Sequence, residues 1–136
     1  MSTIAFAGQF KVYPGAKVDK KATEEAQQLV DGTKLGKGTR TSIYTTGDSF
    51  KKVFDFYKGI SKEYKMPWMG AKVKRLPSGQ EIKEAFFIFD GAPDITTSKL
   101  WIKIQWPYIG TVKMEGYAVK YGDIRETTTI SVSEQK

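Results

Sequence analysis

Apolar side chains recur at three- and four-residue steps between positions 50 and 64, which is the spacing of one face of an α-helix. Most lysines of this segment fall on the opposite side. Asp48 or Thr46 can accept hydrogen bonds from the free amides of the first turn. We therefore predict a strand at 41–46, a turn at Gly47-Asp48 and a long amphipathic helix to Tyr64. Its apolar face comprises Phe50, Val53, Phe54, Tyr57, Ile60 and Tyr64.

A second, shorter helix is predicted for Lys20–Val30. Ala22, Ala26 and Leu29 form one helical stripe there, and Gly32 is placed to end it. The following glycines and lysines at 33–39 superficially resemble a phosphate-binding loop. Their spacing is wrong for one, and the segment follows a helix rather than a strand. We expect a basic linker.

Alternation of apolar and polar positions predicts the strands. Glu81–Asp90 is apolar on both faces toward its end, which is typical of a central strand. In Ser98–Trp106, Leu100 and its alternate neighbours form one apolar face, while Trp101 and Lys103 occupy the other. Pro107 should end or bend this strand. The other expected strands are Ile4–Val12, Thr111–Tyr121 with a bulge or tight bend at Gly116, and Ile124–Val132.

These elements predict an α+β fold. We expect one long and one short helix packed on one face of an antiparallel sheet of about four to six strands. The 136 residues, 40% of them hydrophobic, suit a single domain spanning 1–136.

The chain contains no cysteine, histidine or asparagine. The chain therefore lacks the residues for disulfides, thiol nucleophiles, Ser-His-Asp triads, haem ligation by His or Cys and the usual zinc sites. We predict no cofactor and no metal site. Two carboxylate pairs, Glu84 with Glu126 and Asp90 with Asp94, could act as general acid and base or hold Ca²⁺. No spacing supports either role, so we expect Asp90 and Asp94 to cap a turn, and we favour a protein that is not an enzyme.

The formal charge of +7 favours contact with an anionic ligand, a lipid surface or an acidic protein. Basic residues gather between 58 and 75, and aromatic planes beside lysines can stack on a ligand. Nucleic acid is the less favoured partner. The alternative is that Trp101 packs under the loop at 65–79. The candidate ligand-binding surface comprises Trp68, Lys72, Lys74, Arg75, Trp101, Lys103 and Tyr108.

The run Y-x-T-x-D-S-F-x-K-V-x-x-F-Y-K at 44–58 resembles a pattern of small, uncharacterised, exported or lipid-anchored bacterial envelope proteins. The segments at 13–17, 89–92 and 127–130 fit the same pattern. The resemblance implies a location in the bacterial envelope and a helix packed on an antiparallel sheet. It implies no activity, cofactor or catalytic residue.

Residues 1–10 fit the tail of a signal peptide, because Ala5-Phe6-Ala7 has the small-x-small form that precedes cleavage. The alternative is the first strand noted above. We accordingly expect a periplasmic or otherwise extracytoplasmic protein, with the cytoplasm as the alternative. The expected function is a non-catalytic binding or structural module that contacts an anionic ligand, lipid surface or protein partner. The alternative function is a small enzyme, or a lipid or cofactor carrier with a cavity between helix and sheet.

Overall fold

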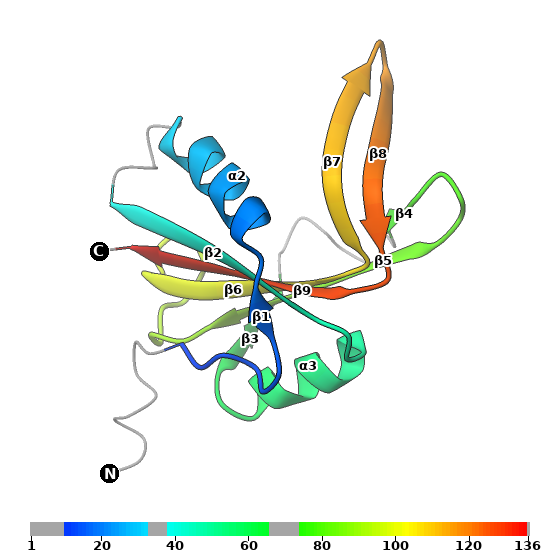
Figure 1. The fold of residues 1–136 in the computed structure, drawn as a ribbon. Helices are drawn as coiled ribbons and strands as arrows, with labels where there is room; N and C mark the ends of the chain where they lie inside the picture. The colour runs from blue at the N-terminus through cyan, green and yellow to red at the C-terminus, as the bar shows by residue number, and fades with distance from the viewer. Residues whose placement is uncertain (1–9, 33–37, 66–73, 136) are drawn as a thin grey trace.

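The computed structural model describes residues 10–32, 38–65 and 74–135 (Figure 1). Two helices and nine strands occupy these residues, which confirms the α+β class. In chain order they are β1 (Lys17–Val18), α2 (Lys20–Asp31), β2 (Thr39–Thr46), α3 (Phe50–Lys58), β3 (Lys62–Tyr64), β4 (Lys74–Arg75), β5 (Glu81–Ile88), β6 (Leu100–Trp106), β7 (Tyr108–Glu115), β8 (Ala118–Arg125) and β9 (Thr128–Gln135).

The main sheet has the strand order β1-β2-β9-β6-β5-β3, and β4 adds to β5. Every pairing is antiparallel, as predicted. The last strand, β9, lies between β2 and β6, so the end of the chain holds the two halves of the sheet together. Within the part of the chain that the structure describes, strands β7 and β8 pair only with each other.

Helix α3 covers the face of the sheet that carries the main core. Val53 and Tyr57 of this helix are fully buried and Phe50 and Phe54 are partly buried, so these four residues of the predicted apolar face pack as expected. Alternate residues of the central strands supply the other side of the interface. The core comprises Tyr13, Val53, Tyr57, Ala85, Phe87, Phe89, Leu100, Ile102, Ile104, Ile130 and Val132.

Both ends of α3 differ from the prediction. The N-cap is Ser49, whose hydroxyl oxygen accepts a hydrogen bond from the Lys52 amide at 3.2 Å. The carboxylate of Asp48 instead accepts from the Tyr13 hydroxyl at 2.6 Å. The helix ends at Lys58, because the backbone beyond it leaves the helix and forms β3 along β5. Backbone pairing with β5 therefore outweighs the helical spacing that continues to Tyr64.

Helix α2 lies on the opposite face of the sheet, over β2 (Figure 1). Tyr44 contacts the core beneath α3, whereas the neighbouring Ile43 lines a pocket beside α2. The prediction that both helices pack on one face is therefore wrong, because β2 presents large apolar side chains to both faces. The predicted lengths are also reversed. The helix predicted to be long, α3, has 9 residues, and the helix predicted to be short, α2, has 12.

Side chains of α2 close the outer edge of β2. The Gln27 amide accepts from the Thr41 backbone N–H at 2.8 Å and donates to the Thr39 carbonyl at 3.0 Å. The Thr23 hydroxyl accepts from the Ile43 N–H at 2.9 Å. These bonds replace those of a neighbouring strand, so this edge is protected from pairing with another chain. Neither helix of the described ranges is long and apolar enough to cross a membrane.

Pro107 separates β6 from β7, as predicted, and β7 and β8 form a hairpin that stands clear of the main sheet (Figure 1). Gly116 has a φ of 62° and lies in the hairpin turn, which agrees with the predicted tight bend and not with a bulge, and the segment predicted as one strand at 111–121 is in fact two strands. Ile124 belongs to β8, and the final strand begins only at Thr128. The expected strand Ile4–Val12 falls largely outside the described residues, and Phe10–Val12 form no strand.

Candidate functional site

Trp101 and Lys103 lie on β6, on the face of the sheet opposite α3. The Trp101 side chain is half-buried, with its ring centroid 6.2 Å from that of Phe86. The Lys103 ammonium lies 2.9 Å from the carboxylate of Glu84, whose side chain is only 10% exposed. Lys103 is therefore paired within the sheet. Because the Glu84 carboxylate already neutralises its charge, Lys103 is a weaker candidate for binding an anion.

The structure separates Arg75 from Trp101. Arg75 pairs with Glu81 at the start of β5, whereas Trp101 lies opposite Ile88 at its end. Seven residues of extended strand span roughly 20 Å. The exposed Arg75 guanidinium donates to the Gly79 carbonyl at 3.1 Å. Trp68 and Lys72 lie outside the described residues, and Lys74 is described only as backbone of β4.

Asp90 and Asp94 cap the turn between β5 and β6, as predicted. Asp90 accepts hydrogen bonds from the Ser98 hydroxyl at 2.8 Å and the Lys99 amide at 2.7 Å. Asp94 accepts from the hydroxyls and an amide of Thr96 and Thr97. Both carboxylates are thus engaged locally. Within the described ranges no group of three or more acidic side chains could hold a metal ion.

The β7–β8 hairpin exposes apolar side chains at its outer end. Met114 is 66% exposed and Tyr117, beside the turn, is fully exposed. The charges of the hairpin are mixed, because Lys120 pairs with Glu115 at 3.1 Å and Arg125 pairs with Asp123 at 3.0 Å. The hairpin was not predicted, because Gly116 is compatible with a bulge or a tight bend and the residues at 111–121 were assigned to one strand.

The base of the hairpin is closely packed. A methyl group added at Gly110 would lie 2.5 Å from the carboxylate of Asp123. The Arg125 guanidinium lies over the Tyr108 ring, 5.1 Å from its centroid. Burial raises the pKa of the Tyr108 phenol, and the carboxylates of Asp19 and Asp123 raise it further against the opposing effect of Arg125. Negative charge therefore outweighs positive charge around this phenol.

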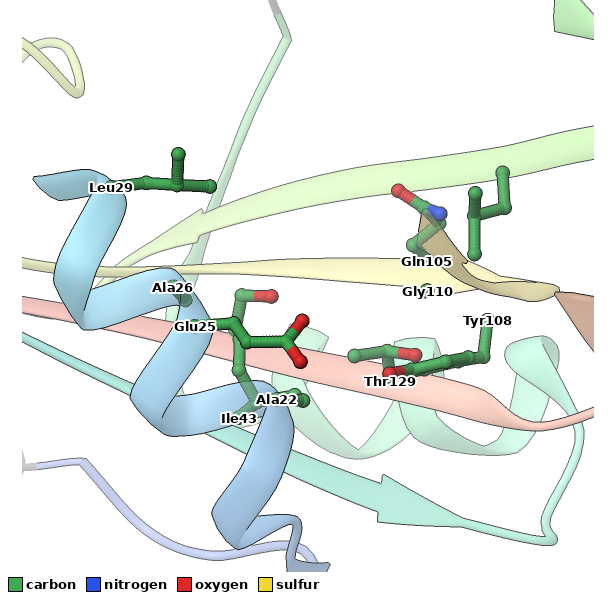
Figure 2. A pocket seen from close by; sticks show the side chains of 11 residues that line it. Ala22, Glu25, Ala26, Leu29, Ile43, Gln105, Tyr108, Gly110 and Thr129 are labelled. Atoms are coloured by element: carbon green, nitrogen blue, oxygen red, sulfur yellow. The ribbon is translucent and has the colours of Figure 1, made fainter. Parts of the chain in front are cut away.

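A pocket of about 210 Å³ lies between α2, the sheet and the hairpin base (Figure 2). It is smaller than the usual drug-sized site of about 300–1,000 Å³ and combines polar and apolar walls. Among the predicted site residues whose side chains the structure describes, only Tyr108 lines it. Its walls are Ala22, Glu25, Ala26 and Leu29 of α2, Tyr108, Ile109 and Gly110 of β7, and Ile43, Gln105, Thr129 and Ser131 of the sheet.

Thr129 supplies a buried hydroxyl to this pocket. The residue is 8% exposed, and its Oγ1 has no hydrogen-bond partner among the described residues. Such an unpaired buried group usually costs about 1–3 kcal/mol and calls for a specific explanation. The sequence signalled only a Thr-rich strand, since the pairing of a hydroxyl depends on which elements pack beside it.

Replacing Thr129 with valine should raise the free energy of unfolding by about 1 kcal/mol, because valine keeps the shape and removes the unpaired hydroxyl. Urea denaturation of the variant and of the wild-type protein measures the difference. Thr128→Val is the matched control, since the Thr128 hydroxyl donates to the Asp48 carbonyl at 2.6 Å and its loss should destabilise. Destabilisation by both substitutions would show that the Thr129 hydroxyl is paired in solution.

Comparison of the chain with protein-family models, curated proteins and solved structures finds no match. The resemblance carried by the segment 44–58 stays a prediction. The functional argument therefore depends on the exposed hairpin, the pocket and the local pairing of the charged groups.

Proposed function

We propose that this protein is a non-catalytic binding module of a bacterial envelope, and that hairpin β7–β8 contacts a protein partner. The hairpin standing clear of the sheet, with Met114 and Tyr117 exposed, is the observation that supports this most strongly (Figure 1). Large apolar side chains gathered at the end of one element are typical of contact sites, and aromatic residues and methionine are enriched at protein interfaces.

A protein partner suits the hairpin better than an anionic ligand or a lipid surface. Most of its basic side chains are matched within the hairpin by Glu115 and Asp123, so it offers little excess positive charge. Because β7 and β8 pair only with each other among the described residues, both strands also have an outer edge to which an extended segment could add. The edge of β2, by contrast, is closed by α2.

The non-catalytic part of the proposal is supported by the state of the acidic groups. Asp90 and Asp94 accept hydrogen bonds within a turn, and Glu84 pairs with Lys103. The carrier alternative needs a large apolar cavity between the sheet and the helix predicted from Phe50, and this α3 interface is filled by fully buried side chains such as Tyr57 and Phe87. The envelope location is supported by the resemblance at 44–58 and by the small-x-small form of Ala5-Phe6-Ala7. Fractionation of cells carrying the native locus tests it, and intact protein in the cytosol would contradict it.

The binding proposal is tested with a double variant, Met114→Ser with Tyr117→Ser. Immobilised on beads, the wild-type protein should retain a defined partner from an envelope extract, and the double variant should retain at least about tenfold less, a loss of about 1.4 kcal/mol. Both proteins should melt at the same temperature, because the substituted side chains are exposed. The purified partner should then bind the wild-type protein directly.

The matched control is Val12→Ser with Val18→Ser, which removes two exposed apolar side chains outside the hairpin. This variant should retain the partner as the wild-type protein does. Equal retention by the hairpin variant would contradict the proposal. So would binding of the wild-type protein to anionic vesicles that the hairpin substitutions abolish, which would identify a lipid surface as the target.

A further inference from the structure

The pocket beside α2 contains a polar group that the fold leaves unused. Thr129 lies on β9, on the face opposite the main core, and Figure 2 shows its side chain to one side of α2 and beside Tyr108. Its hydroxyl is buried and has no partner among the described residues. Less than 1 Å² of this oxygen is accessible, so a bound polar group pairs with it by turning the Thr129 side chain toward the pocket, which removes the cost of leaving the hydroxyl unpaired.

Glu25 supplies the charge of the pocket. Figure 2 shows its carboxylate extending from α2 toward Thr129 and Tyr108. Among the described residues that line the pocket, none is a lysine or an arginine. The nearby Arg125 is occupied by Asp123. In a chain of formal charge +7, this pocket therefore has the opposite sign to the molecule as a whole.

The rest of the wall is apolar or a neutral hydrogen-bonding group. A small apolar surface beside the carboxylate is formed by Ala22 and Ala26 of α2 and Ile43 of β2. The side-chain amide of Gln105 donates to the Pro107 carbonyl at 3.2 Å, and its oxygen can still accept a hydrogen bond from a ligand. The pocket thus combines one anion, hydrogen-bonding oxygens and a short apolar wall.

We infer that this pocket binds a small aliphatic amine, whose ammonium group pairs with Glu25 and hydrogen-bonds to Thr129. An ammonium has three N–H donors, which matches a carboxylate, a hydroxyl and an amide oxygen. Its short hydrocarbon stem packs on Ala22, Ala26 and Ile43. This site goes beyond the proposed contact through the hairpin and involves neither Met114 nor Tyr117.

A series of probes of equal size and different charge tests the inference. 1-Aminobutane is protonated at pH 7 as a lysine side chain is, 1-butanol is neutral and butyrate is anionic. Titration followed by amide chemical shifts should show saturable changes at Ile43, Gly110 and Thr129 for the amine. Butanol should bind more weakly, and butyrate should bind at least about tenfold more weakly than the amine, a difference of one charge-assisted hydrogen bond.

Two pocket variants and one control assign the contacts. Glu25→Gln should weaken binding of 1-aminobutane by about tenfold, and Thr129→Val by about threefold to tenfold, as expected for a charged and a neutral hydrogen bond. Glu24→Gln removes a neighbouring exposed carboxylate of α2 that does not line the pocket, and it should change nothing. High salt should weaken the binding of 1-aminobutane and leave the binding of butanol unchanged.

Several results would overturn the inference. They are equal binding of butyrate and the amine, an unchanged affinity in Glu25→Gln, or shifts confined to residues away from the pocket. The hairpin variant Met114→Ser with Tyr117→Ser should bind the amine like the wild-type protein. A failure of the pocket experiment therefore leaves the hairpin proposal standing, and a failure of the hairpin experiment leaves the pocket.

Discussion

Phe87→Ala should lower the free energy of unfolding by about 3–5 kcal/mol, which is the usual cost of removing a fully buried phenylalanine. Phe87 is completely buried between the sheet and α3. Its ring centroid lies 5.3 Å from that of Phe54 and 6.4 Å from that of Tyr57. The truncation would leave a cavity between a central strand and the helix, where neither side can collapse easily. Urea denaturation gives the difference from the midpoint and the slope.

Two further substitutions calibrate this result. Phe54→Ala should cost less than Phe87→Ala, because the Phe54 side chain is only partly buried. Tyr117→Ala removes a fully exposed ring and should change stability by no more than about 0.5 kcal/mol. Equal losses for Phe87→Ala and Tyr117→Ala would mean that α3 does not cover this face of the sheet.

Asp90→Ala should lower the free energy of unfolding by about 2–3 kcal/mol. The Asp90 carboxylate accepts hydrogen bonds from the Ser98 hydroxyl and the Lys99 amide, and Ser98 is buried. Hydrogen bonds to a charged group are each worth about 1.5–3 kcal/mol, and the partial exposure of Asp90 keeps the sum near the lower end. The loss would loosen the turn that joins the two central strands β5 and β6.

The same contacts predict an acid dependence. Partial burial alone would raise the pKa of Asp90, but the hydrogen bonds from Lys99 and Ser98 outweigh burial and lower it. The folded state therefore binds this proton less tightly than the unfolded state does. The contribution of Asp90 to the free energy of unfolding is present above the ordinary aspartate pKa of about 3.9. It is lost as the pH falls through the lower pKa that Asp90 has in the folded protein. Asp90→Ala should reduce the loss of stability between neutral pH and pH 3, and an unchanged pH profile would contradict this assignment.

The sequence predicted the core of the fold because local spacing determined it. The three- and four-residue steps from Phe50 to Tyr57 identified the face of α3 that packs on the sheet. The alternation around Ile102 identified the buried side of β6, and Pro107 marked its end. In each case one element carries the whole pattern in its own residues.

The features that were missed depend on how elements meet. Ile43 and Tyr44 are adjacent apolar residues, and the sequence alone does not say that a helix lies on each side of the strand that carries them. Gly116 is compatible with a bulge or a hairpin turn, and the pairing of β7 with β8 decides between them. The pocket needs Glu25 of α2 beside Thr129 of β9, a juxtaposition that no spacing along the chain encodes.

Site-specific photo-crosslinking in living cells tests the central claim that hairpin β7–β8 contacts a protein partner. A photoreactive amino acid placed at Tyr117 reports on the tip of the hairpin, and the same group at Val18 reports on an exposed apolar position of β1. We predict a discrete adduct with one other protein from position 117 and none from position 18. No adduct from either position, or an adduct only with a second copy of this chain, would contradict the account.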